Sequence, residues 1–88
     1  MKKTALAGLR GLGPKSQAWL HAIGIETPEQ LRACDPFEVY ARLRDVVPGL
    51  SINMLYGLIG AIEDIDWRQV QRERKLAILL RLEAMGLL

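Results

Sequence analysis

The sequence predicts an all-α fold, a small five-helix bundle. Half of its 88 residues are apolar, and in several stretches they recur at the spacing of one helix face. No alternating strand pattern occurs, and neither Asn-Gly nor Asp-Gly marks a β-hairpin. Capping residues, prolines and glycines divide the chain into short segments. A chain of this length forms one domain, residues 1–88, with a small core.

The first half of the chain contains a short helix candidate that leads into a glycine-rich stretch, and two short helices after it. Residues 3–9 are rich in Ala and Leu, and residues 14–23 form the next candidate, with Ala18 facing inward. Gly24 is expected to end this second helix, because glycine is favoured just after a helix C-cap. Residues 27–30 read Thr-Pro-Glu-Gln, which is typical of a capped helix start.

The second half predicts three longer helices, each beginning after a residue whose side chain accepts a hydrogen bond from the first turn. They are 36–46 after Asp35, 52–63 after Ser51 and 69–85 after Asp66. The middle one is apolar on nearly all sides and is expected to be buried, with Gly57 and Gly60 allowing neighbouring helices to approach. The last has a basic side and an apolar side, formed by Val70, Leu76, Ala77, Leu79, Leu80 and Met85.

The most informative stretch is residues 9–18, where Gly-Leu-Gly leads into a polar helix start, the pattern of a helix-hairpin-helix. Gly11 and Gly13 are predicted to adopt positive φ and to leave no Cβ in the way of a phosphate. The N–H groups and the dipole of the following helix then form an anion site. Lys15 adds a positive charge to it and Ser16 a hydroxyl.

Such a hairpin contacts backbone phosphate and reads no bases. The alternative is a tight helix–helix connection with Lys15 in solvent, because short glycine motifs also match by chance. The candidate nucleic-acid-binding residues are those of this hairpin and two basic residues near the C-terminus. They are Arg10, Gly11, Gly13, Lys15, Ser16, Arg72 and Lys75.

The net charge of +2 is unevenly distributed. Residues 1–25 carry four basic and no acidic side chains, residues 26–66 carry eight acidic against three basic, and residues 67–88 carry five basic against two acidic. The two basic ends are expected to form one face, which suits nucleic acid. The small net charge predicts weak binding, since tight DNA-binding domains are strongly basic.

Several classes are disfavoured. Cys34 is the only cysteine, so no internal disulfide or paired-cysteine zinc site is expected, which suits a reducing cytosol. The first seven residues imitate the start of a signal peptide, but Arg10 interrupts the apolar run too early. No stretch reaches the length of a membrane span. We therefore expect a cytoplasmic protein with no membrane association, no cofactor and no metal ion.

An enzyme is also disfavoured. Helix-hairpin-helix glycosylases place a Lys just after the second hairpin glycine, where Lys15 stands, and an Asp further along, where Asp35 stands. Those enzymes flip a base into a deep pocket between two domains, which 88 residues cannot build. Asp35 before Pro36 is explained as a helix cap.

Several further positions carry a resemblance that runs from Leu9 to the end of the chain. They are Leu12-Gly13-Pro14-Lys15-Ser16, Trp19-Leu20, Gly24-Ile25, Thr27, Leu31, Val39-Tyr40-Ala41-Arg42-Leu43, Ser51-Ile52-Asn53-Met54-Leu55-Tyr56, Ala61 and Trp67. In these the chain resembles the C-terminal domain of the TfoX (Sxy) family, regulators associated with natural DNA uptake (transformation). The resemblance implies an all-helical domain of helix-hairpin-helix or SAM-like type and a role in switching on competence genes.

Full-length members of that family carry a separate N-terminal α/β domain, which nothing before Leu9 matches. We therefore expect a stand-alone homologue or one half of a divided system. Two functions stay open: a regulatory domain that binds DNA weakly, without sequence preference and with strong salt dependence, and a protein-interaction or homodimerisation module without DNA binding. The apolar ending Leu87-Leu88 favours the second.

Overall fold

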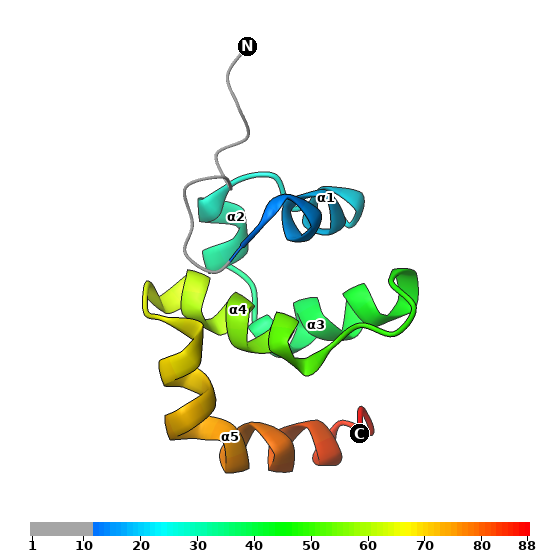
Figure 1. The fold of residues 1–88 in the computed structure, drawn as a ribbon. Helices are drawn as coiled ribbons and strands as arrows, with labels where there is room; N and C mark the ends of the chain where they lie inside the picture. The colour runs from blue at the N-terminus through cyan, green and yellow to red at the C-terminus, as the bar shows by residue number, and fades with distance from the viewer. Residues whose placement is uncertain (1–11) are drawn as a thin grey trace.

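A computed structural model describes residues 12–88. The short helix predicted over residues 3–9, and with it Arg10 and Gly11, lies outside the described residues. The described part contains five α-helices and no strand, as Figure 1 shows. The helices are α1 (Pro14–Ala22), α2 (Pro28–Arg32), α3 (Pro36–Val46), α4 (Ile52–Glu63) and α5 (Trp67–Ala84). The all-α prediction is confirmed.

Side-chain caps begin four of these helices where the sequence predicts them. The Thr27 hydroxyl accepts a hydrogen bond from the Gln30 backbone N–H at 3.1 Å, and the Gln30 side-chain oxygen accepts one from the Thr27 backbone N–H at 3.2 Å. This pair closes a capping box at the start of α2. Asp35, Ser51 and Asp66 cap α3, α4 and α5 in the same way. Because Asp66 is the cap, α5 begins two residues earlier than predicted.

Glycines end α1 and α5 and turn the chain back onto the core. Gly24 has φ of 90° and Gly86 has φ of 74°, the left-handed region that glycine adopts without strain. The Leu87 N–H then donates to the Leu82 carbonyl at 2.8 Å, which is the Schellman pattern. Leu87 consequently packs against the core, and its carbonyl accepts a hydrogen bond from Arg44. Of the two final leucines, only Leu88 is exposed.

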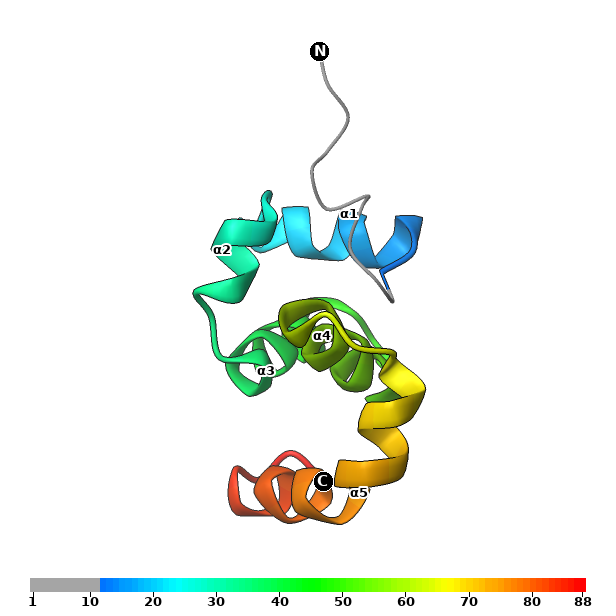
Figure 2. The same ribbon diagram turned by 90° about the vertical axis from the view of Figure 1, so that its left-hand side faces the viewer.

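The helices form layers around α4, which contacts α2, α3 and α5. Figures 1 and 2 show α1 and α2 on one side of the α3–α4 layer and the greater part of α5 on the other. Lys15 lies on α1, which this layer separates from the greater part of α5. The predicted single basic face also includes Lys2, Lys3 and Arg10, which lie outside the described residues. In both views α5 also changes direction along its length, although it contains neither Pro nor Gly.

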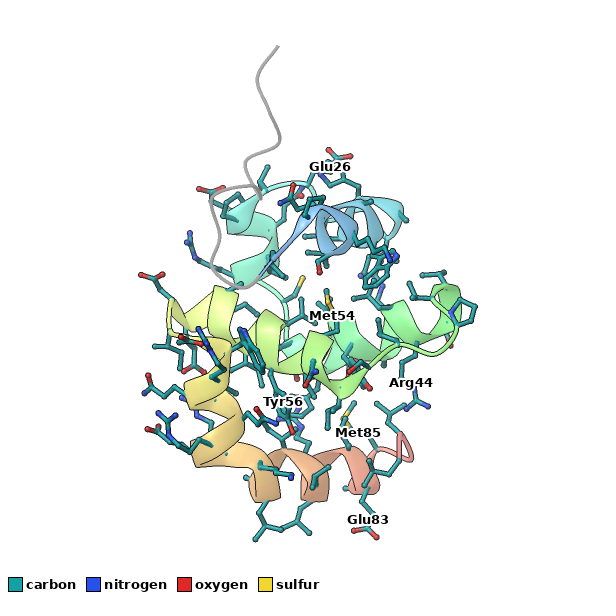
Figure 3. The ribbon with its side chains drawn as sticks, in the orientation of Figure 1. Glu26, Arg44, Met54, Tyr56, Glu83 and Met85 are labelled. Carbon is teal, nitrogen blue, oxygen red and sulfur yellow. The ribbon has the colours of Figure 1, made fainter. Side chains whose placement is uncertain are left out.

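The prediction that α4 is buried is confirmed, because every residue from Met54 to Ala61 is buried. In Figure 3, Met54 lies on the side of α4 that faces α1, and Tyr56 on the side that faces α5. The prediction that Ala18 faces inward is wrong, because Ala18 is exposed and Leu20 is the buried residue of α1. Of the predicted apolar side of α5, Val70 is buried but Leu76, Ala77 and Leu80 are exposed, and the other buried residues of this helix are Ile78 and Leu82.

Gly60 permits the backbone of the α4–α5 connection to approach closely, whereas the sequence predicted the approach of a neighbouring helix. The connection after α4 folds back over Gly60, and the Ile65 N–H donates to the Gly60 carbonyl at 2.9 Å. A Cβ on Gly60 would lie 2.6 Å from the Ile65 carbonyl oxygen and 3.3 Å from the Trp67 nitrogen. Asp64, with φ of 60°, makes the turn. The glycine therefore sets how α4 joins α5.

Candidate phosphate-binding site

The chain enters α1 through Gly13, whose backbone is extended, with φ of −88° and ψ of −178°. The prediction of positive φ at Gly13 is wrong. Gly13 occupies the N-cap, and N-cap residues of every type adopt extended backbone angles, so the turn requires no left-handed residue there. A Cβ on Gly13 would meet no atom of residues 12–88 within 4 Å. Substitution of Gly13 thus causes no steric clash with the described part of the chain.

The start of α1 has no side-chain cap, unlike the starts of the other four described helices. The helix begins its own hydrogen bonding with the Gln17 N–H, which donates to the Gly13 carbonyl at 3.0 Å. The N–H groups of Lys15 and Ser16 precede that bond and have no partner within the helix. No acidic residue lies in the first turn. Among the described residues, no side-chain cap occupies the positive end of this helix dipole, which favours an anion.

The side chains predicted to contact phosphate lie on two helices, α1 and α5. Lys15 is exposed beside these N–H groups, and Ser16 is half-buried. On α5, the predicted Arg72 and Lys75 are exposed. Arg72 and Lys75 belong to α5, and the greater part of this helix lies on the other side of the α3–α4 layer from α1 (Figure 1). The site that the structure assembles from the described candidates is Gly13, Lys15 and Ser16.

Two further basic side chains of α5, Arg68 and Arg74, form ion pairs with acids. Arg68 pairs with Asp66 at 3.2 Å, and Arg74 forms a two-bond pair with Glu63, at 2.6 and 2.7 Å. The hydrogen bonds from Arg74 lower the pKa of Glu63 below its ordinary value of 4.5, and they outweigh the opposing effect of partial burial. Arg74 therefore serves to join α4 to α5.

Replacing Arg74 with Gln is expected to lower the free energy of unfolding by roughly 0.5 kcal/mol at neutral pH, because the pair is about two-fifths exposed. Because the pKa of Glu63 is lower in the folded state, the ion pair stabilises the fold at pH values above 4.5. This contribution disappears as the pH falls and Glu63 is protonated. Urea unfolding at neutral and acidic pH measures it. A stability difference that stays constant across this range would contradict the assignment.

A surface groove of about 410 Å³ lies next to this helix start and was not predicted from the sequence. Trp19 of α1 and Trp67 of α5 contribute to its walls together with α4 and the loop before it. The lining residues are Ser16, Trp19, Val47, Pro48, Gly49, Leu50, Ser51, Asn53, Met54, Gly57 and Trp67. None of these carries a charge, so an anion would bind at the helix start beside the groove rather than in it. The sequence contains the two tryptophans that line the groove, which are half-buried in the structure, but it does not show that they lie near each other.

Asp35, the residue that the glycosylase comparison singled out, has structural partners. Its carboxylate caps α3 through the Phe37 N–H at 2.9 Å and accepts a hydrogen bond from Arg81 at 2.7 Å. The Arg81 guanidinium also lies 4.4 Å from the centre of the Phe37 ring. Asp35 therefore ties the start of α3 to α5.

No three His, Cys, Asp or Glu side chains within residues 12–88 are grouped so that they could hold a metal ion. None of the helices described there has the length and apolar character needed to cross a membrane.

Comparison with known proteins agrees with the fold. A crystal structure of an uncharacterized protein from Listeria monocytogenes, in a triclinic form, superposes with a TM-score of 0.79. The match covers 92% of this chain and 93% of that chain at 24% identity, so it bears on the fold alone. No curated protein matches. The family model of the TfoX C-terminal domain matches residues 2–82. The chain therefore belongs to the TfoX C-terminal domain family.

Proposed function

We propose that this chain is a non-enzymatic regulatory domain that binds the nucleic-acid backbone through the start of α1. The observation that carries the proposal is the uncapped N-terminus of α1, with exposed Lys15 beside it. The other four described helix starts are occupied by their own side chains. Membership of the TfoX C-terminal family supports a regulatory role in DNA uptake and competence.

The expected interaction is weak and independent of sequence. One helix end contacts one phosphate, and backbone N–H groups carry no information about bases. Exposed Arg72 and Lys75 add to the attraction from a separate part of the surface. Since the binding energy is mainly electrostatic, affinity falls steeply as salt rises. Such a domain would act in the cytoplasm and would locate DNA without choosing a site on it.

The sharpest test is to close the site without disturbing the fold. Gly13→Asp places a carboxylate at an N-cap whose backbone is already extended and whose Cβ would meet no described atom. Like the Asp35 and Asp66 caps, it should stabilise its helix, by about 0.5 kcal/mol. The carboxylate would also accept hydrogen bonds from the backbone N–H groups of Lys15 and Ser16, and its charge would repel phosphate. We expect Gly13→Asp to lose at least tenfold in DNA affinity while its melting temperature stays equal or rises.

Fluorescence anisotropy of labelled duplex and single-stranded DNA, at low and at higher salt, measures the binding. Gly13→Ser is the matched control, because it supplies a neutral cap that a phosphate can displace. Lys15→Glu is expected to weaken binding as well. Wild-type binding by both Gly13→Asp and Lys15→Glu would exclude the start of α1 as the site. Absence of binding by the wild type at low salt would overturn the DNA function.

A second candidate function is protein interaction without DNA binding. The predicted apolar tail supports it less than expected, because Leu87 packs on the core. A different observation favours it, namely the exposed leucines of α5.

A further inference from the structure

Both tryptophans of the chain line the surface groove beside the start of α1. Trp19 and Trp67 are half-buried, so part of each side chain stays accessible to a ligand. Met54, which lies on the side of α4 that faces α1 in Figure 3, and Gly57 add buried apolar surface to the lining. At about 410 Å³ the groove has the size of a small-ligand site. A flat aromatic ring suits such a lining, because aromatic side chains stack on it.

The charge at the border of the groove suits an anionic group at one end. The charged residues adjacent in sequence to the described lining residues are Lys15, Asp66 and Arg68. Asp66 and Arg68 pair with each other at 3.2 Å, and none of the ion pairs of residues 12–88 involves Lys15. The net charge of the three is therefore that of Lys15, at the start of α1. A ligand with one anionic end and one uncharged aromatic end matches this distribution.

The anionic end and the aromatic end of such a site are close together because α1 supplies both. Lys15 and Ser16 belong to the first turn of α1, and Ser16 also lines the groove. Trp19 follows Ser16 by three residues and therefore lies on the same side of the helix. One helical turn is about 5.4 Å long. A phosphate at the start of α1 thus lies one turn from Trp19, a span that the sugar between a phosphate and its base bridges in a nucleotide.

We propose that the groove binds an unpaired base of a single-stranded nucleic acid, stacked on the tryptophans, while a neighbouring phosphate lies at the start of α1. This inference rests on the proposed function and names its substrate class. The bases of a duplex are paired and stacked on each other, so they stay outside the groove. Asn53, an exposed lining residue, has a side-chain amide that can both donate to and accept from the edge of a base. Stacking tolerates any base, since each has a π face.

Two single strands of equal length separate base binding from phosphate binding. Oligothymidylate and an abasic oligonucleotide carry the same phosphates, and only the first carries bases. We expect the wild type to bind oligothymidylate about tenfold more tightly at low salt, a typical contribution of one stacked base. Equal affinity for both strands would overturn the base site and leave phosphate binding at α1 intact. No affinity for either strand would overturn the proposed function, and this inference with it.

Tryptophan emission reports on the groove directly, because the two tryptophans of the chain both line it. Oligothymidylate should quench this emission and the abasic strand should not. Emission that responds to neither strand, as expected if residues 1–11 filled the groove, would contradict the proposal. Emission that changes with protein concentration alone would indicate a second copy in the groove and would contradict it as well.

Trp19→Leu tests the role of the ring. This variant should bind both strands equally, with the weak affinity that the wild type shows for the abasic strand. Leu80→Ala is the matched control, since it removes an exposed apolar side chain of α5 outside the described lining and should keep the tenfold preference. Circular dichroism checks that both variants are folded, and the strand comparison and the emission decide the matter without a variant if Trp19→Leu is not. A folded Trp19→Leu variant that keeps the preference would overturn the proposal.

Discussion

Replacement of Gly60 by Ala is expected to lower the free energy of unfolding by about 2 kcal/mol, even though Ala favours helices over Gly by about 1 kcal/mol. The reason is the connection that folds over this glycine. The new Cβ would lie 2.6 Å from the Ile65 carbonyl oxygen, which is backbone and cannot rotate away. Relief of the clash would move the turn at Asp64 and, with it, the start of α5.

Urea unfolding followed by circular dichroism measures this effect. Gly13→Ala is the matched control, because it adds the same methyl group where no atom of residues 12–88 lies within 4 Å. Its cost should stay within about 1 kcal/mol, the usual effect of a poorer N-cap. Equal destabilisation by the two variants would show that the contact over Gly60 is not responsible.

Leu31→Ala is expected to cost about 3 kcal/mol, a typical value for truncating a fully buried leucine. Leu31 has no exposed surface and is the one buried residue of the five-residue helix α2. A helix this short is unstable alone and depends on its packing. The loss would be a large part of the total stability of a domain of this size, roughly 5–10 kcal/mol.

The neighbouring Arg32→Ala provides the comparison for Leu31→Ala. Arg32 is exposed on the same helix, so its removal should change stability by less than about 0.5 kcal/mol. Amide hydrogen exchange adds a local measurement, because loss of the anchor should speed exchange in α2 before the rest of the domain. A variant with wild-type stability would mean that the capping box at Thr27 holds α2 without its apolar anchor.

The boundaries of the helices were predictable because they are set locally. Thr27, Asp35, Ser51 and Asp66 each accept a hydrogen bond from a residue two or three positions ahead, so a short stretch of sequence contains all the information. Gly24 similarly ends α1 through its own backbone conformation. These features need no knowledge of what packs on the helix.

The inward faces were harder to predict. α5 has apolar residues on more than one side, and periodicity alone could not tell that Ile78 and Leu82 are buried while Leu76 and Leu80 are exposed. Both sets have the spacing of a helix face. Which set is buried depends on the position of the other layers, and this is a tertiary property.

The candidate site was predicted in part. Lys15 and Ser16 do lie at a helix start after Gly13, since Pro14 signals that start locally. The backbone angles of Gly13 were wrong because glycine permits positive φ without requiring it. The groove between Trp19 and Trp67 was missed because its walls come from four separate segments. The sequence alone does not show that these segments meet.

The single uncapped helix start has a consequence for avidity. Among the described helices only α1 begins without a side-chain cap, so one copy of the domain offers one phosphate contact and two copies joined in a tandem fusion would offer two. Two weak phosphate sites on one particle act on a long DNA at an effective concentration set by their separation. Long duplexes would then be bound more tightly than short ones, and two duplexes could be bridged, although each single contact is weak.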